Sequence, residues 1–413
     1  MNPDGTGAAN ISFSFPRDST MGAVSLNTSA APFPSIGTEG CAVNTPACGP
    51  NNENARGLFF SGTIFGVEFL GIGGAHATGK LQYLYLSDDT DATIDFRFLD
   101  IWAGSGGSTK GVSAAHTLGD RLYFGMQDTG GNKPYFFALV STVQAPGLNA
   151  VVGLQPTAGT HVLDLQGDEL PDLGQKMGNS APVVLIDSIT DFNARIYVAN
   201  NGGMVRATTN LPLSPAFAPG HWVKASPTRV EFTAKASVTT PKTASLLPSD
   251  RAFPAMVSFK GRLYAARNTT TGPQLWGCDP QGDLACDPAD WILIAANGQG
   301  DTQLTQLNDA ANTTIGLLAA TANTLFIGFN NASGVQIFKT TAATPTLRSD
   351  FTGQLGCVAG VAGCNGLGGK GLGAPATNTR ILDAKAMTFN AQSWLYVVAG
   401  NATAPVQVFR VSP

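Results

Sequence analysis

A short apolar motif that recurs along the chain constrains its fold more than any other feature. Each copy is Leu or Ile, then Tyr or Phe, then two further apolar or small residues, followed by a polar turn. Short runs rich in aromatic and β-branched residues, bounded by Gly, Asn and Asp, are typical of strands. A repeated unit of this kind is typical of solenoids and propellers. The copies, which we interpret as the second strand of each repeat, are Leu84–Ser87, Leu122–Gly125, Ile196–Ala199, Leu263–Ala266, Leu325–Gly328 and Leu395–Val398.

The stretch from Arg251 to Gly298 shows the complete repeat. It holds four apolar runs separated by turn-forming residues such as Lys260-Gly261. Four antiparallel strands form a small twisted sheet that cannot bury both of its faces alone, and packing copies around an axis removes this problem. The four runs are Ala255–Phe259, Leu263–Ala266, Gln274–Trp276 and Trp291–Ala295.

The fold class that we predict is an all-β β-propeller with six blades. Seven blades is the alternative, with Leu58–Ile72 in an irregular extra blade, and a solenoid is the rival architecture. Hairpin turns favour antiparallel blades over the parallel coils of a solenoid. The last repeat stops after its third strand, so we expect an N-terminal strand, either Ile11–Phe15 or Ala23–Asn27, to close the ring. The predicted domains are an N-terminal segment, 1–56, which also carries a Cys41–Cys48 loop, and the propeller, 57–413.

Charge and hydropathy exclude several classes of function. The chain has 413 residues, a net charge of −4 and only 13% charged residues, against about a quarter in a typical domain. The absence of a basic stripe argues against nucleic acid as a partner. No apolar run reaches the roughly 18 residues of a membrane span, and the first residues do not form a signal peptide. An uncharged polar surface favours an extracellular or cell-surface location, with the periplasm as an alternative.

Six cysteines fall into three local couples, which we interpret as disulfide staples. Six cysteines permit 15 pairings, so the connectivity is inferred from proximity alone. Zinc is the competing interpretation, but the Cys-x-x-Cys spacing and neighbouring histidines of zinc sites are missing. Disulfides persist outside the reducing cytosol, which agrees with an extracellular location. The couples are Cys41 with Cys48, Cys278 with Cys286, and Cys357 with Cys364.

Two sets of residues are candidates for ligand binding. Asp88, Asp89 and Asp91 lie on a turn, and clustered carboxylates suit calcium, although the spacing fails as an EF-hand and a solvated hairpin tip is the preferred explanation. We therefore expect no cofactor, with calcium as the alternative. Trp102 and Trp222 flank loops and are candidates for stacking on a sugar. The strand positions of Trp276 and Trp291 instead indicate packing between blades.

Catalytic motifs are absent from the sequence. There is no Gly-x-Ser-x-Gly and no His-Glu-x-x-His, and a Gly-x-Gly-x-x-Gly string at 366–371 lacks the strand and helix that it needs. His116 lies in a strand-like run, where a packed or hydrogen-bonded histidine is expected. Glycosidases need only two carboxylates at the right separation. A propeller can supply these from different blades, so an enzyme is unsupported rather than excluded.

The full repeat resembles secreted bacterial β-propeller proteins of the kelch-like or cell-surface kind. Its pattern is Gly or Asn, any residue, Leu-Tyr, any residue, Gly or Ala, any residue, Asn, and it recurs between Leu58 and Val411. The resemblance implies a scaffold for binding. We therefore expect a non-catalytic extracellular propeller for adhesion or surface assembly that recognises a glycan, a cell-surface protein or its own copies. The alternative is a carbohydrate-active hydrolase or lyase with carboxylates in the central funnel.

Overall fold

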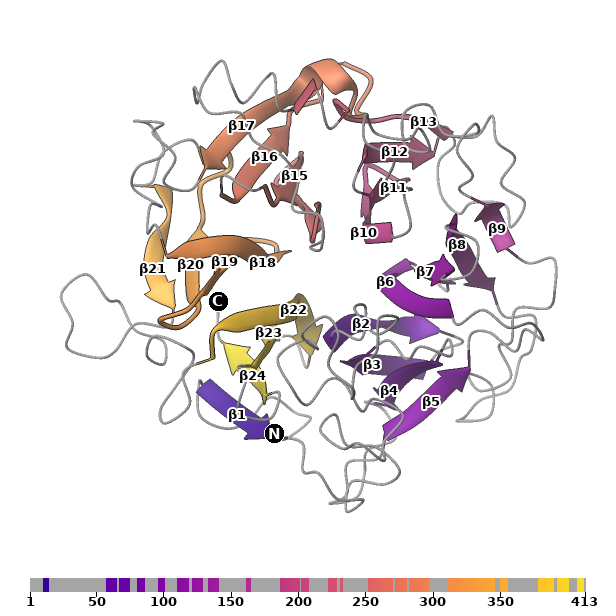
Figure 1. Cartoon of the computed structure of the whole chain (residues 1–413), viewed down its shortest axis with the longest axis vertical. Helices are drawn as coiled ribbons and strands as arrows, with labels where there is room; N and C mark the ends of the chain where they lie inside the picture. Colours follow the sequence, from indigo (N-terminus) through magenta and orange to yellow (C-terminus); the bar gives the residue numbers. More distant parts are fainter. Residues whose placement is uncertain are drawn as a thin grey trace.

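The chain folds into antiparallel four-stranded sheets in this computed structural model (Figure 1). Six such sheets are present among the described residues. The architecture is an all-β propeller. The structure describes residues 10–14, 57–64, 67–74, 80–85, 96–100, 110–118, 121–128, 133–140, 161–164, 186–200, 202–207, 222–228, 231–232, 252–269, 272–280, 282–296, 311–345, 350–355, 378–389, 392–400 and 407–411.

Each sheet is a meander in which consecutive strands pair, except that the last sheet has the order β1-β24-β23-β22. The first three sheets are β2 (Gly57–Ile64), β3 (Val67–Gly74), β4 (Lys80–Tyr85) and β5 (Phe96–Asp100); β6 (Lys110–Leu118), β7 (Arg121–Asp128), β8 (Lys133–Val140) and β9 (His161–Asp164); and β10 (Ile186–Phe192), β11 (Arg195–Asn200), β12 (Gly203–Ala207) and β13 (Trp222–Lys224). The other three are β14 (Met256–Phe259), β15 (Arg262–Arg267), β16 (Gln274–Cys278) and β17 (Trp291–Ala296); β18 (Asn312–Ala320), β19 (Leu325–Asn331), β20 (Gln336–Thr340) and β21 (Thr352–Leu355); and β22 (Arg380–Phe389), β23 (Gln392–Gly400), β24 (Gln407–Val411) and β1 (Asn10–Ser14). A short 3-10 helix, η3 (Pro288–Asp290), precedes β17.

The first strands of neighbouring sheets contact one another around a common centre (Figure 1). The contacts run from β2 to β6, β10, β14, β18 and β22, and from β22 back to β2. At the N-terminus, β1 pairs antiparallel with β24, with Asn10 opposite Val411 and Ser14 opposite Gln407. The other strand considered for this place, Ala23–Asn27, lies outside the described residues. The contacts between the first strands of neighbouring sheets place these strands around the centre of the molecule, where they form its inner wall.

The recurring motif lies in the second strand of five sheets, as predicted, namely β7, β11, β15, β19 and β23. In the first sheet the assignment was wrong. Leu84 and Tyr85 lie in the third strand, β4, while Leu58–Ile72 form most of β2 and β3 of the same sheet. The reason is that Leu-Tyr is a pattern for any half-buried strand, and β2 and β3 satisfy the strand pattern without the aromatic marker.

The small residue of the motif makes room for the next sheet. A Cβ atom added to Gly125 in β7 would lie 2.5 Å from Cβ of Ile186, the first residue of β10. In the same way, a Cβ atom on Gly328 in β19 would lie 2.7 Å from Cδ1 of Ile381 in β22. Real Cβ atoms do not approach other carbon atoms so closely, so these positions let the inner strand of the following sheet pack directly against the motif.

The tyrosine of the motif joins its sheet to the following one. The Tyr197 hydroxyl accepts a hydrogen bond from the Cys286 backbone N–H at 3.0 Å, and the Tyr264 hydroxyl donates one to the Ala343 carbonyl at 3.1 Å. Burial raises the pKa of Tyr264 to about 12, which keeps its phenol protonated as a donor. A buried Tyr requires a partner for its hydroxyl, and the neighbouring sheet supplies one.

The asparagine of the motif binds the backbone of the next inner strand. Asn268 donates through Nδ2 to the Ile315 carbonyl at 3.1 Å and accepts from the Ile315 N–H through Oδ1 at 2.8 Å. Asn330 accepts from the Ile381 N–H at 2.7 Å. Backbone groups at a sheet edge would otherwise be buried without partners. The repeat therefore encodes the seams between sheets as well as the strands.

The core beside the third and fourth sheets contains Trp276 and Trp291, each 1% exposed, which confirms the prediction that they pack between sheets. Phe232 lies edge-on to Trp276, with ring centroids 4.8 Å apart, and Trp291 Nε1 donates to the Ala225 carbonyl at 2.8 Å. The predicted disulfide between Cys278 and Cys286 is present. The other four cysteines, Cys41, Cys48, Cys357 and Cys364, lie outside the described residues.

The loop closed by this disulfide is also part of a seam. Arg206 donates through Nε to the Cys286 carbonyl at 3.1 Å and through Nη2 to Asp287 at 3.0 Å. The loop therefore connects the fourth sheet to β12 of the third. Asp287 and Asp290 form a capping box around η3.

Candidate active site

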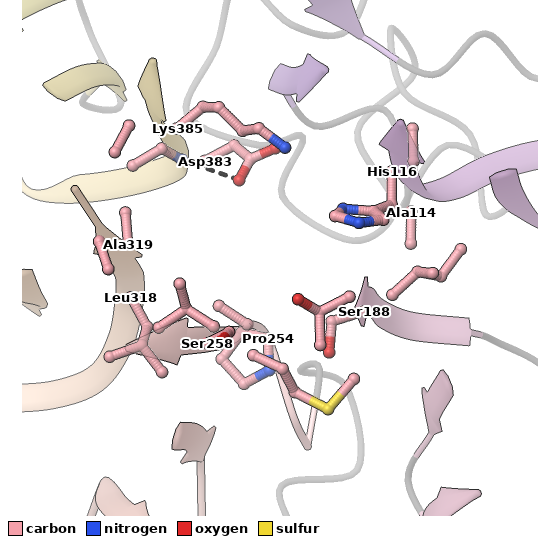
Figure 2. Close-up of a pocket in the computed structure, with 18 of the residues that line it drawn as sticks. Ala114, His116, Ser188, Pro254, Ser258, Leu318, Ala319, Asp383 and Lys385 are labelled. Atoms are coloured by element: carbon pink, nitrogen blue, oxygen red, sulfur yellow. Dashed lines mark hydrogen bonds between the residues drawn. The ribbon is translucent and has the colours of Figure 1, made fainter. Parts of the chain in front are cut away.

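A pocket of about 270 Å³ lies at the centre of the propeller, between the inner strands (Figure 2). Five sheets contribute to its wall, so residues far apart in the sequence meet there. The lining residues are Ala114–His116 of β6, Asp187–Asp191 of β10, Pro254 and Ala255 with Met256–Ser258 of β14, Leu318–Ala320 of β18, and Asp383–Ala386 of β22. A pocket of this size is just below the usual range of small-ligand sites, about 300–1,000 Å³.

The pocket has a charged side and an uncharged side. All of its ionisable groups come from β6, β10 and β22, whereas β14 and β18 supply mainly Ala, Val, Met and Leu side chains. The sixth inner strand, β2, has the sequence GLFFSGTI and contains no ionisable residue. A wall that is polar on one side and apolar on the other matches a sugar ring, which has hydroxyl groups at its edge and C–H groups on its faces.

His116 and Asp191 form a hydrogen-bonded pair on the charged side. His116 Nε2 lies 2.8 Å from Asp191 Oδ1, and the two side chains are 12% and 37% exposed. Burial lowers the pKa of His116, and the charge of Lys385 lowers it further, against the opposing hydrogen bond with Asp191. Burial acts to raise the pKa of Asp191, but the hydrogen bond and charge of His116 and the charge of Lys385 together lower it. At neutral pH the pair is therefore a neutral imidazole beside an ionised carboxylate.

Lys385 lies on β22, and Figure 2 shows its side chain extending toward the pocket with His116 on the opposite side. Burial lowers the pKa of Lys385, although the charges of Asp383 and Asp191 raise it in part. Its ammonium group makes no hydrogen bond or ion pair with the part of the chain that the structure describes. By contrast, Asp383 accepts a hydrogen bond from the Ala384 N–H at 2.8 Å. A half-buried lysine without an acceptor is unusual, because an unpaired charge is costly to desolvate.

Two other polar residues of the pocket wall hold the sheets together. Asp187, which is 2% exposed, accepts a hydrogen bond from the Phe253 N–H at 2.9 Å. Ser188 donates to the Phe253 carbonyl at 2.8 Å. These bonds fasten β10 to the segment before β14, so we assign Asp187 and Ser188 to the scaffold. The other ionisable side chains of the pocket wall, which we consider for chemistry, are His116, Asp191, Asp383 and Lys385.

The arrangement of His116 is suited to general-base catalysis. An ionised Asp191 accepts a hydrogen bond from the Nε2–H group of His116, which places the lone pair of the neutral imidazole on Nδ1, where it can take a proton. A carboxylate that orients a histidine and stabilises its charged form is a common feature of such bases. Among the described residues no group of three potential metal ligands is present. The chemistry that these side chains can perform themselves is therefore proton transfer beside a cation.

The sequence-based candidates for ligand binding remain predictions. Trp222 lies in β13, the fourth strand of its sheet. Trp102 and the carboxylates Asp88, Asp89 and Asp91 lie outside the described residues. His116 was expected to be a hydrogen-bonded histidine of a strand, which it is, but its place on the pocket wall was missed. Asp191, Asp383 and Lys385 were missed altogether, because only the packing of separate sheets brings β6, β10 and β22 to one pocket.

No family model matches the chain, and no curated protein matches it in sequence. Solved structures are similar in architecture. The sialidase of Trypanosoma rangeli, bound to the inhibitor DANA, is 9% identical with a TM-score of 0.45, over 86% of this chain and 55% of the sialidase. The chain thus spans about half the length of that protein. A PQQ-bound aldose sugar dehydrogenase from Streptomyces coelicolor is 9% identical, with a TM-score of 0.44 over 86% of this chain and 94% of the dehydrogenase. A GH43_1 enzyme from Xanthomonas citri complexed with xylotriose is 11% identical, with a TM-score of 0.35 over 86% of each chain.

The expectation of a non-catalytic binding propeller is corrected by these findings. The three solved structures named above are enzymes. The physical reason for the error is that the expectation relied on missing linear motifs. The ionisable groups of this pocket come from three separate sheets and leave no linear motif.

Proposed function

We propose that the protein is a carbohydrate-active enzyme, a hydrolase or a lyase, that acts in the central pocket. The observation that carries the proposal is the His116–Asp191 pair at 2.8 Å, facing a pocket that also contains Lys385. The neutral His116 serves as the base, Asp191 orients it and stabilises its protonated form, and Lys385 binds an electron-rich group of the substrate. The apolar wall of β14 and β18 receives the C–H face of the sugar.

We also propose the number of blades, the strand that closes the last blade and the cellular location of the protein. The six sheets are six blades of one ring, and β1 completes the last blade by pairing with β24; the contacts between inner strands support this. A Cys278–Cys286 disulfide supports an extracellular or periplasmic location. Within the described residues, no helix has the length and apolar character that a membrane crossing requires.

A polysaccharide panel tests the proposed function. Neutral polymers, acidic polymers and amino-sugar polymers are incubated with the purified protein, and new reducing ends are counted together with the change in chain length. We expect cleavage of at least one polymer by the wild type and a large loss of rate in His116→Gln. The proposal is wrong if no polymer is cleaved, or if His116→Gln cleaves as fast as the wild type.

A further inference from the structure

We infer that the substrate is an acidic sugar polymer and that the reaction is β-elimination, which makes the protein a uronate lyase. The inference depends on the proposed function and selects one of its two reaction types. Its starting point is the mismatch between the charged groups of the pocket. Lys385 lacks an acceptor among the described residues, whereas Asp191, Asp187 and Asp383 each accept a hydrogen bond within the protein.

The group that completes the pocket is therefore an acceptor for Lys385. A carboxylate on the sugar ring is the strongest candidate, because a charge-assisted hydrogen bond is about twice as strong as a neutral one. Such a bond also raises the pKa of Lys385, which burial otherwise lowers. Galacturonic, glucuronic, mannuronic and guluronic acids all carry this carboxylate at C5.

The opposing charges of the wall do not prevent this binding. Asp187 is 2% exposed and its carboxylate accepts a hydrogen bond from the backbone of the next sheet, so its role is to hold the sheets together rather than to contact the substrate. Asp191 has a different role, because it balances the positive charge that His116 acquires during the reaction. Asp383 lies on the same strand as Lys385, and its negative charge raises the pKa of the lysine.

Hydrolysis fits the same groups less well. A glycosidase requires one carboxyl group held as a protonated acid and a second as a base or nucleophile. The pKa of Asp191 is lowered by His116 and Lys385, so this carboxyl is not an acid near neutral pH. Asp187 is buried in the seam. Elimination, by contrast, needs one neutral base and one cation, and His116 and Lys385 supply them.

The reaction balances without any further reactant. Lys385 binds the C5 carboxylate of the uronate and draws electron density toward it, which acidifies the proton on C5. Nδ1 of His116 removes that proton, the C5–H electron pair forms the C4–C5 double bond, and the bond from C4 to the glycosidic oxygen breaks. The imidazolium of His116 then returns the proton to the leaving oxygen. The products are one fragment with a new reducing end at that oxygen and one fragment that ends in an unsaturated uronate.

The test compares a uronate polymer with the same polymer after its carboxylates have been reduced to alcohols. Polygalacturonate, alginate and glucuronan are used as the acidic set, and the readout is the ultraviolet absorbance of the unsaturated product. We expect absorbance to rise with at least one acidic polymer and not with its reduced form. Lys385→Met should lower kcat/KM by about 100- to 1000-fold, as removal of one stabilising group does, and Lys385→Arg should recover part of it.

A second measurement does not depend on turnover. Free uronate monosaccharides should raise the melting temperature of the wild type but not that of Lys385→Met, whereas the matching neutral sugars should shift neither. Lys339→Met, on β20 away from the pocket, is the matched control and should behave as the wild type in both assays.

The outcomes separate the two levels of the proposal. Cleavage of reduced or neutral polymers to reducing ends without unsaturated product overturns the lyase and leaves the carbohydrate-active enzyme standing. Wild-type activity in Lys385→Met overturns the role of Lys385. Inactivity toward all polymers, with no thermal shift by uronates, overturns both.

Discussion

The seams between sheets and the central pocket both bury polar side chains, but the two regions differ in how completely these side chains are hydrogen-bonded. In the seams, the groups described above have matched partners: Asn268 with both backbone groups of Ile315, and Arg206 with Cys286 and Asp287. In the pocket, Lys385 has no acceptor among the described residues, and His116 uses one ring nitrogen only. Satisfied polar groups stabilise a fold, whereas unsatisfied ones are kept for a ligand. The comparison therefore assigns stability to the seams and activity to the pocket.

The largest expected effect tests the pocket through activity. His116→Gln and Asp191→Asn should each lower kcat/KM about 100- to 10,000-fold, the range for loss of a general base, while leaving folding cooperative. The matched control is Asp279→Asn, which breaks another carboxylate pair, the 2.6 Å contact with Arg262, away from the pocket. Steady-state kinetics and circular dichroism check this. If Asp279→Asn is impaired as strongly as Asp191→Asn, the distinction between the pocket and the rest of the sheets fails.

The next effect tests a seam through stability. Asn268→Ala should lower the free energy of unfolding by about 2–4 kcal/mol, because it strands the N–H and the carbonyl of Ile315 in a buried seam. The control is Asn193→Gly, which keeps a positive φ of 46° available and removes only an exposed bond to the Leu284 carbonyl. Urea denaturation measures both. A loss in Asn268→Ala no larger than that in the control would show that the motif asparagine does not fasten the sheets.

A smaller effect tests how closely neighbouring sheets approach. Gly125→Ala should cost about 1–3 kcal/mol, as overpacking does, because the new Cβ would meet the fixed Cβ of Ile186 at 2.5 Å. Gly277→Ala is the control, since its Cβ would meet side-chain atoms no closer than 3.2 Å, namely the movable end of Ile294 at 3.2 Å and Cε1 of Tyr264 at 3.4 Å. Thermal unfolding should rank Gly125→Ala clearly below Gly277→Ala. Equal melting temperatures would contradict the close packing of β7 on β10.

The sequence predicts the seams better than the pocket, and the repeat explains the difference. Leu263, Tyr264, Ala266 and Asn268 are neighbours in the chain, so one motif encodes a strand and its contacts with the next sheet. Asn268 also shows the limit of motifs. It opens an Asn-x-Thr string that would permit glycosylation, yet it is 3% exposed and its amide is used in the seam. The surroundings of a side chain, which no short string records, decide its availability.

The pocket could not be predicted because its residues have no local signature. His116, Asp191 and Lys385 occur on strands whose alternation is set by packing, and each alone resembles an ordinary polar residue of a strand. Whether these three residues lie together depends on which inner strands pack next to one another once the sheets have assembled. A search for ionisable residues in the first strand of each repeat would have found them: β6, β10 and β22 carry such residues, and β2, β14 and β18 do not.

The smallest effect distinguishes the two regions by pH. Because the folded protein lowers the pKa of His116 below 6.5, the unfolded chain binds a proton more readily in the window just below that value. The free energy of unfolding should therefore fall as pH drops through this window, with a slope of at most about 1.4 kcal/mol per pH unit for one proton. His116→Gln lacks this contribution, so its stability should approach that of the wild type toward acid pH.

Asp191 acts in a separate pH window, because its folded pKa is lowered below 3.8 and its contribution to stability is lost only at still lower pH. Asn268→Ala, which removes no ionisable group, should instead differ from the wild type by a constant amount across the same range. Denaturation at a series of pH values measures all three proteins, and a pH-independent offset for His116→Gln would mean that the histidine is not held neutral by the pocket.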